Sequence, residues 1–217
     1  MAQLPKELLT GPQTETGRFG VGLFLILALS MMATRDYHFS SALHLADTSW
    51  AVFLLAGLYL RPRWALPALL GIAVAVDLFA FWQDGPVRIA CFSPAYPGLM
   101  LAYAALWGAG RLARRDWRST GASSAQNTPY WLVPIELMGW TVAGVVTAFA
   151  ISNLTFWAFS GHFTTMSLAA YASQVSIYLS GYLTTTTAYI LVSLLAIAGW
   201  SAIMARRKDH IRVAHSA

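Results

Sequence analysis

Six apolar segments constrain this chain more than any other feature. They lie at roughly 19–34, 42–60, 64–82, 95–113, 131–158 and 177–205. A helix needs about 20 apolar residues to cross the hydrocarbon core of a bilayer, and each segment approaches or exceeds that length. Their residues are continuously apolar and do not alternate with polar ones, which excludes a transmembrane β-barrel. The sequence therefore predicts an all-α polytopic membrane protein with six transmembrane helices.

The charged residues support a membrane protein and argue against several soluble classes. Only 11% of the 217 residues are charged, whereas soluble domains usually carry about 25%. The net charge of +5 does not indicate nucleic-acid binding, because the charges occur in short runs between the apolar segments. The sequence also lacks a phosphate-binding glycine loop, an HExxH pair and a GxSxG elbow. These absences argue against a nucleotide-driven protein, an intramembrane protease and a lipase.

Lysine and arginine are distributed very unequally between the two sides of the predicted bundle. If the segments alternate in direction, twelve of these residues fall on one side and two on the other. Basic loops favour the cytoplasmic side of a membrane. Both termini are therefore predicted to be cytoplasmic, and the first, third and fifth loops to face outward. The two basic residues expected in those outward loops are Arg35 and Arg88.

The same pattern divides the chain into a membrane domain and two tails. Residues 1–18 form a predicted cytoplasmic N-terminal tail, residues 19–205 the six-helix domain, and residues 206–217 a basic cytoplasmic C-terminal tail. The polar stretch at about 114–130 is rich in Ser, Gly and Asn, which predicts a flexible cytoplasmic loop between two three-helix halves.

Cys91 is the only cysteine, and it lies in the loop sequence VRIACFSPAYPGLM. The predicted topology places it on the outer side of the membrane. In a bacterium that compartment is oxidising, and an odd cysteine has no partner in its own chain. Two interpretations are open. Cys91 is either a small apolar core residue or a thiolate ligand for a transition metal or cofactor, with Arg88 able to lower its pKa.

Polar residues near the outer side are further candidates. His38 and His44 flank the start of the second segment, and Asp47 follows one turn after His44. Asp77 lies inside the third segment, in AVAVDLFAFW. An acid within a transmembrane segment is costly and by default marks a functional position, although an acid near the segment end can instead reach the interface. Each histidine can likewise be a polar loop residue.

Aromatic side chains are more frequent on the predicted outer side. This excess favours an aromatic-walled cavity for a large, partly apolar ligand, and the alternative is an ordinary interfacial aromatic belt. The fifth loop, predicted at 160–176, is long enough to fold over such a cavity, and Gln174 and Asn153 have amides suited to hydrogen bonding. The outer-side aromatic residues are Phe79, Phe81, Trp82, Phe92, Tyr96, Phe156, Trp157, Phe159, Tyr171, Tyr178 and Tyr182.

With these residues in place, the chain resembles the substrate-binding S components of energy-coupling-factor transporters. More narrowly, it resembles the solitary cobalamin-specific S components, the BtuM family, over roughly residues 20–205. The resemblance rests on ALHLADTSWAVFLLAGLYL, on Asp77 in AVAVDLFAFW, and above all on CFSPAY with Cys91 and Tyr96. It implies an S-component-like bundle whose third-loop cysteine coordinates the cobalt of the corrin ring.

The resemblance also implies roles for individual residues. Cys91 would be the axial cobalt ligand, and it would be the catalytic residue if an upper ligand is removed. Asp77, Tyr96 and one histidine before the second segment, His38 in preference to His44, would line the corrinoid pocket. Aromatic side chains would hold the corrin ring, and Asp77 and Asn153 would bind its amides. The full set of expected cobalamin-binding residues is His38, His44, Asp77, Trp82, Arg88, Phe92, Tyr96, Asn153 and Tyr178, with Cys91 as the metal ligand.

One feature departs from the wider S-component pattern. The first helix of typical members carries an AxxxA-type stripe for docking an energising module, whereas GVGLFLILALSMMA has only scattered small residues. This departure is compatible with a protein that acts alone, and the sequence leaves open whether an energising module takes part. The expected function is binding of cobalamin from the periplasmic side of a bacterial inner membrane, and its uptake. The alternatives are an S component for another vitamin, with Cys91 incidental, and a structural or assembly subunit of a membrane complex.

Overall fold

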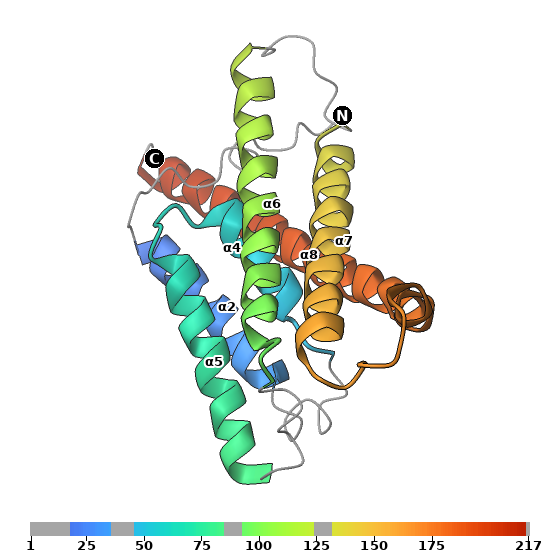
Figure 1. Cartoon of the computed structure of the whole chain (residues 1–217). Coiled ribbons are helices and arrows are strands. Elements are labelled where there is room, and N and C mark those ends of the chain that lie inside the picture. The colour runs from blue at the N-terminus through green and yellow to red at the C-terminus, as the bar shows by residue number, and fades with distance from the viewer. Residues whose placement is uncertain (1–17, 36–45, 85–92, 124–131, 216–217) are drawn as a thin grey trace.

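The computed structural model describes residues 18–35, 46–84, 93–123 and 132–215, and the regular secondary structure in these ranges consists of helices (Figure 1). The described elements are α2 (Arg18–Arg35), α4 (Ser49–Tyr59), α5 (Ala65–Asp84), α6 (Tyr96–Ser123), α7 (Leu132–Phe159) and α8 (Leu168–His215). No strand occurs in these ranges. The prediction of an all-α protein is confirmed for them.

Three of the six helices are long and apolar enough to cross a membrane. They contain the stretches Ala65–Gln83, Ile135–Phe159 and Leu168–Ile197. Helices α2 and α4 are apolar but shorter, and α6 carries Arg111, Arg114 and Arg115 in its second half. The structure therefore supports a membrane protein with three candidate spans. Six spans and cytoplasmic termini remain predictions.

Helix α4 is the core of the bundle. Every side chain from Ser49 to Leu58 is buried, and α4 packs against α2, α5, α6, α7 and α8. A helix that is apolar on all faces is stable only when other elements surround it, and α4 meets that condition. Its 11 residues span only about 16 Å at 1.5 Å per residue.

Glycines allow α4, α6 and α7 to approach one another closely. A Cβ atom on Gly57 would overlap the carbonyl oxygen of Trp107, and one on Gly110 would overlap that of Leu54. Between α6 and α7, a Cβ on Gly144 would lie 2.8 Å from the Cβ of Ala109. Small residues at helix crossings are the usual means of tight packing in membranes, where dispersion contacts replace the hydrophobic effect.

Helix α8 has 48 residues and crosses behind α6 and α7 at an oblique angle (Figure 1). Its apolar stretch Leu168–Ile197 has 30 residues, about 45 Å of helix, which exceeds the hydrocarbon thickness of about 30 Å. Tilting is the usual accommodation of such a mismatch. Tyr182 on α8 contacts the ring of Trp50 with centroids 4.3 Å apart, and the hydroxyl of Tyr189 donates to the carbonyl of Ala46 at 2.7 Å.

The predicted segment boundaries differ from the helices in four places. The second segment was expected to begin at residue 42, but residues 46–48 are not helical and α4 begins at Ser49. Helix α6 continues through 114–123, the first part of the predicted flexible loop, and α8 continues through 206–215, most of the predicted tail. Charged residues end an apolar run without ending a helix, because Arg and Ala are good helix formers.

The fourth difference concerns the predicted fifth loop. Only residues 160–167 are non-helical, and α8 begins at Leu168. The expectation of a long loop at 160–176 was therefore wrong. Its second half is rich in Ser and Ala, and the serine hydroxyls donate to carbonyls of their own helix, as Ser173 does to Ala170 at 2.8 Å and Ser176 to Ser173 at 3.0 Å. Such local bonds let polar residues remain in a helix.

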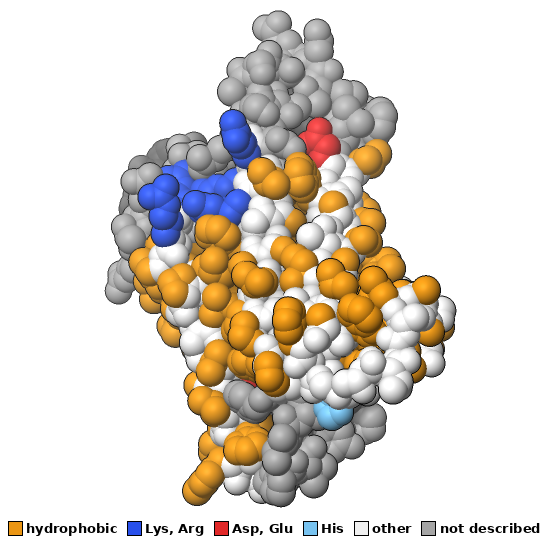
Figure 2. Space-filling view, in the orientation of Figure 1, with side chains coloured by type: hydrophobic (Ala, Val, Ile, Leu, Met, Phe, Trp, Pro, Cys, Tyr) orange, Lys and Arg blue, Asp and Glu red, His pale blue; other side chains and the backbone are white. Residues whose placement is uncertain are grey.

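The bundle has two chemically distinct ends. Figure 2 shows Lys and Arg side chains gathered at one end, a broad apolar surface below them, and a histidine toward the other end. We call the first the arginine end, defined by Arg61, Arg63, Arg111, Arg114 and Arg115. The other is the Asp77 end, where α4 and α6 begin and α5 and α7 finish.

Candidate functional site

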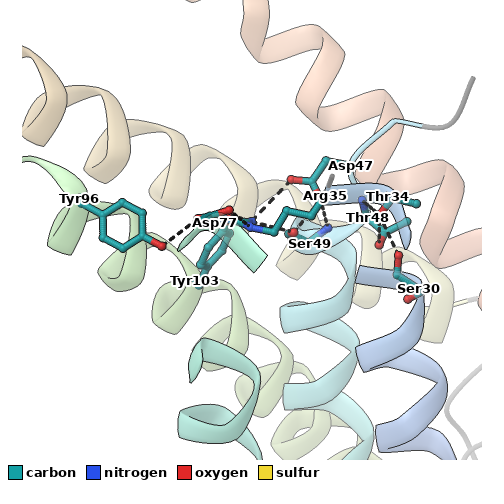
Figure 3. Close-up of polar contacts among 9 residues, drawn as sticks. All are labelled: Ser30, Thr34, Arg35, Asp47, Thr48, Ser49, Asp77, Tyr96 and Tyr103. Carbon is teal, nitrogen blue, oxygen red and sulfur yellow. Dashed lines mark hydrogen bonds and ion pairs between the residues drawn. The ribbon is translucent and has the colours of Figure 1, made fainter. Parts of the chain in front are cut away.

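A buried ion pair joins α2 to α5 at the Asp77 end (Figure 3). Arg35 is the last residue of α2, and its Nε and Nη2 donate to Oδ1 and Oδ2 of Asp77, each at 2.6 Å. The two side chains are 6% and 18% exposed. A guanidinium matches a carboxylate in this two-point geometry, which makes the pair both strong and directional. Asp77 is therefore an ion-paired acid, and Arg35 is its counter-ion.

Arg35 has further partners on α4 and α6. Its Nη1 donates to the hydroxyls of Ser49 at 3.0 Å and Tyr103 at 2.5 Å. The ring of Tyr103 is fixed by stacking on Phe53, with centroids 4.5 Å apart. These contacts satisfy most of the guanidinium donors, as a buried charge requires. One arginine thus connects four helices, α2, α4, α5 and α6.

Asp47 completes the charge distribution around Arg35. Its Oδ2 lies 3.8 Å from Nη1 of Arg35, and its Oδ1 accepts bonds from the amide and hydroxyl of Ser49 at 2.8 and 2.6 Å. The Asp47 side chain is 43% exposed. Two carboxylates thus accompany one guanidinium, and the more exposed carboxylate lies just before α4.

Tyr96 joins this network from the first residue of α6. Its hydroxyl donates to Oδ2 of Asp77 at 2.8 Å. Asp77 therefore holds α2 through Arg35 and α6 through Tyr96. We call Arg35, Asp47, Ser49, Asp77, Tyr96 and Tyr103 the Arg35 network.

The network brings together two of the residues predicted from sequence, Asp77 and Tyr96. Asn153 lies in α7, where its Nδ2 donates to the carbonyl of Phe149 at 2.9 Å and its Oδ1 accepts from Tyr171 at 3.1 Å. Trp82 is 81% exposed and Tyr178 is 60% exposed. The remaining predicted site residues, His38, His44, Arg88, Cys91 and Phe92, lie outside the described residues.

Arg35 is the residue of this candidate site that was not predicted from the sequence. It was expected to be an outward loop charge, but in the structure it is a helix residue whose side chain is buried. The sequence did contain a signal for it. An acid inside an apolar helix requires a cation, and Arg35 is one of only two basic residues expected on that side.

An aromatic cluster covers the point where α7 ends and α8 begins. The rings of Phe156 and Phe163 are 5.7 Å apart, and Phe163 lies 4.7 Å from Tyr171. The indole Nε1 of Trp157 donates to the carbonyl of Met166 at 3.0 Å. The connection at 160–167 is therefore packed onto the ends of its own helices, and Asn153 and Tyr171 bond to each other below it.

Two other features concern ligand binding. Within the part of the chain that the structure describes, no group of three or more His, Cys, Asp or Glu side chains could hold a metal ion. A shallow apolar groove of about 650 Å³ runs along α7 from Ile135 to Val146. It lies on the half of α7 that begins at the arginine end, so it is separate from the Arg35 network.

Comparison with known proteins gives no family assignment, because no protein-family model and no curated protein matches this chain.

Proposed function

We propose that this protein is an inner-membrane cobalamin-binding uptake protein. In this proposal the corrinoid binds at the Asp77 end, which faces the periplasm, and Cys91 supplies an axial ligand to its cobalt. The six predicted segments span the membrane with both termini in the cytoplasm. The cargo is cobalamin, and no energising partner is required for binding.

The contact between Asp77 and Tyr96 is the observation that carries this proposal. The resemblance assigned both residues to one corrinoid pocket, and they are hydrogen-bonded at 2.8 Å although 19 positions separate them. Cys91 lies between them in sequence, five residues before Tyr96. The contact thus brings together the two ends of the segment 77–96, which contains the proposed cobalt ligand Cys91. It supports a common site without testing the ligand itself.

The chemistry proposed for Cys91 follows from the nature of sulfur. A thiolate is a soft, electron-donating ligand suited to a transition metal. Its donation to cobalt(III) weakens the bond to the opposite axial ligand. With cyanide in that position, the Co–C bond breaks heterolytically, the electron pair leaves with cyanide, and the released anion takes a proton from water. The cobalt keeps its oxidation state, so this step needs no oxidant or reductant.

The absorption spectrum of the purified protein tests the ligand. The natural protein, Cys91→Ser and Cys91→Ala are purified after growth with cobalamin, and Ser93→Ala serves as a control in the same segment. We expect a coloured natural protein and Ser93→Ala variant, with an altered corrinoid spectrum that both Cys91 variants lose. Equal spectra and equal bound cofactor in all four proteins would refute cobalt ligation by Cys91. A colourless natural protein that binds another vitamin, or that copurifies with fixed partners, would refute the whole proposal.

A further inference from the structure

Five arginines from two distant parts of the sequence meet at the arginine end. Arg61 and Arg63 lie in the turn between α4 and α5, and Arg111, Arg114 and Arg115 lie on α6. About fifty positions separate the two groups. Figure 2 shows Lys and Arg side chains in neighbouring blue groups at this end. The fold, and not a single run of sequence, therefore creates the cluster.

Arg111 connects the two groups. Its Nη1 donates to the carbonyls of Leu60 and Arg61 at 3.3 and 3.2 Å, and its Cζ lies 4.8 Å above the ring of Trp107. Leu60 is the C-cap of α4, so Arg111 satisfies carbonyls that the end of a helix leaves without intrahelical donors. This contact fixes the turn against α6 and holds the neighbouring arginines in place.

Among the side chains that the structure describes, the cluster has little opposing charge nearby. The acids whose side chains the structure describes are Asp47, Asp77 and Glu136, and the first two belong to the Arg35 network at the other end. Glu136 lies in the first turns of α7. Arg63 and Arg115 are both exposed, so their guanidinium groups are accessible to an external anion.

The surroundings of the cluster match the polar–apolar boundary of a membrane. Trp64, next to Arg63, is 50% exposed, and its ring contacts Phe24 edge-on with centroids 5.2 Å apart. Leu112 on α6 is 44% exposed. Tryptophan is typical of the headgroup level of a bilayer, and lipid phosphates lie at the same level. Guanidinium groups there can bind phosphate oxygens in a two-point geometry.

We propose that the arginine end is a binding site for the phosphate of an anionic phospholipid, held by Arg63 and Arg115 beside Trp64. A soluble polyanion would not require the exposed apolar side chains of Trp64 and Leu112 beside the arginines. The lipid would bridge the α4–α5 turn and α6 and hold the bundle at a defined depth. This site lies at the opposite end from the proposed cobalamin site and does not depend on it.

Lipid retention by the full-length protein tests the proposal. The protein is reconstituted in nanodiscs of phosphatidylcholine alone, and of an equal mixture of phosphatidylcholine and phosphatidylglycerol. It is then extracted, and its retained lipids are counted by native mass spectrometry. We expect selective retention of phosphatidylglycerol and a higher thermal midpoint in the mixed discs. In Arg63→Gln/Arg115→Gln the preference should fall by about fivefold for each arginine removed. Arg206→Gln/Arg207→Gln removes the same charge from α8 and should keep the preference.

Several results would overturn the proposal. Equal retention of the two lipids by the natural protein would exclude an anionic-lipid site. If the Arg206/Arg207 control lost as much lipid preference as the Arg63/Arg115 variant, the preference would depend on net charge and not on this site. If inorganic phosphate added to phosphatidylcholine discs raised the midpoint as much as phosphatidylglycerol does, the ligand would be soluble phosphate. Should the double variant fail to fold, Arg63→Gln alone supplies the comparison, and a lipid preference equal to that of the natural protein would refute the site.

Discussion

The guanidinium of Arg35 and the carboxylate of Asp77 form a two-point ion pair with both N–O distances at 2.6 Å. This pair joins the end of α2 to the second half of α5, inside a chain that is 57% hydrophobic. In such surroundings, neither charge is tolerated without the other. The pair explains why an acid can occupy the apolar α5 helix, and it fixes the end of the bundle to which we assign cobalamin binding.

Removing either member of this pair should be costly. We expect Asp77→Asn and Arg35→Gln each to lower the free energy of unfolding by about 3 to 5 kcal/mol, because each leaves a buried charge unpaired. The double variant Arg35→Met/Asp77→Leu should recover much of that loss. Unfolding in detergent micelles measures all three. Asp47→Asn is the control, because this half-exposed carboxylate lies 3.8 Å from Arg35 and should contribute about 1 kcal/mol or less. Losses no greater than the Asp47 control would show that the pair is not structurally important.

The two tyrosines that bond to this pair should have separable effects. Tyr96→Phe removes the donor to Asp77 and, on the proposed function, should weaken cobalamin binding about tenfold, the equivalent of about 1.4 kcal/mol. Tyr103→Phe removes an acceptor from Arg35 in a fully buried position. It should lower the free energy of unfolding by about 1 to 3 kcal/mol and leave the affinity of the folded protein unchanged. Cobalamin titration and unfolding of the same samples distinguish the two effects. If Tyr96→Phe left the affinity for cobalamin unchanged and Tyr103→Phe lowered it, Tyr96 would not belong to the binding site.

Close packing of α4 against α6 yields a third prediction. Gly57→Ala should lower the free energy of unfolding by about 1 to 3 kcal/mol, because its Cβ would overlap the backbone of Trp107 and force the helices apart. Gly108→Ala is the matched control on α6, where an added Cβ meets no atom within 4 Å. It should be neutral or stabilising by up to about 1 kcal/mol, since Ala favours a helix over Gly. Thermal unfolding compares them, and equal midpoints for the two variants would contradict the observed packing.

Sequence patterns were sufficient to predict the boundaries of two helices, but not the start of a third. Segments predicted at 64–82 and 131–158 correspond to α5 and α7 within two residues at each end, because the hydrophobic requirement of a membrane sets both their length and their limits. The start of α8 was missed by nine residues. Its first turns contain serines, tyrosines and Gln174, a composition that is typical of a loop. The sequence does not show that the serine hydroxyls donate hydrogen bonds to carbonyls of their own helix.

The candidate site was only partly visible in the sequence. Asp77 was identifiable as a single residue, because an acid inside an apolar run is costly wherever it lies. Its partners were not, since contacts over 42 positions to Arg35 and 19 positions to Tyr96 depend on how the helices pack. Arg35 was also assigned to a loop, because a charge at the end of an apolar segment is ambiguous until its neighbours are known.

Membrane orientation can be tested with cysteines placed at the two ends. In a Cys91→Ser background, which removes the only native thiol, Arg63→Cys reports on the arginine end and His162→Cys on the α7–α8 connection. Both positions are exposed. Twelve of the fourteen basic residues fall on the side predicted to be cytoplasmic, so the positive-inside rule places Arg63 there. A membrane-impermeant maleimide should label His162→Cys in intact spheroplasts and Arg63→Cys only after lysis. The Cys91→Ser protein without an added cysteine gives the background. Labelling of Arg63→Cys in intact spheroplasts, and of His162→Cys only after lysis, would show the opposite orientation. The Asp77 end would then face the cytoplasm, where it could not receive cobalamin from the periplasm.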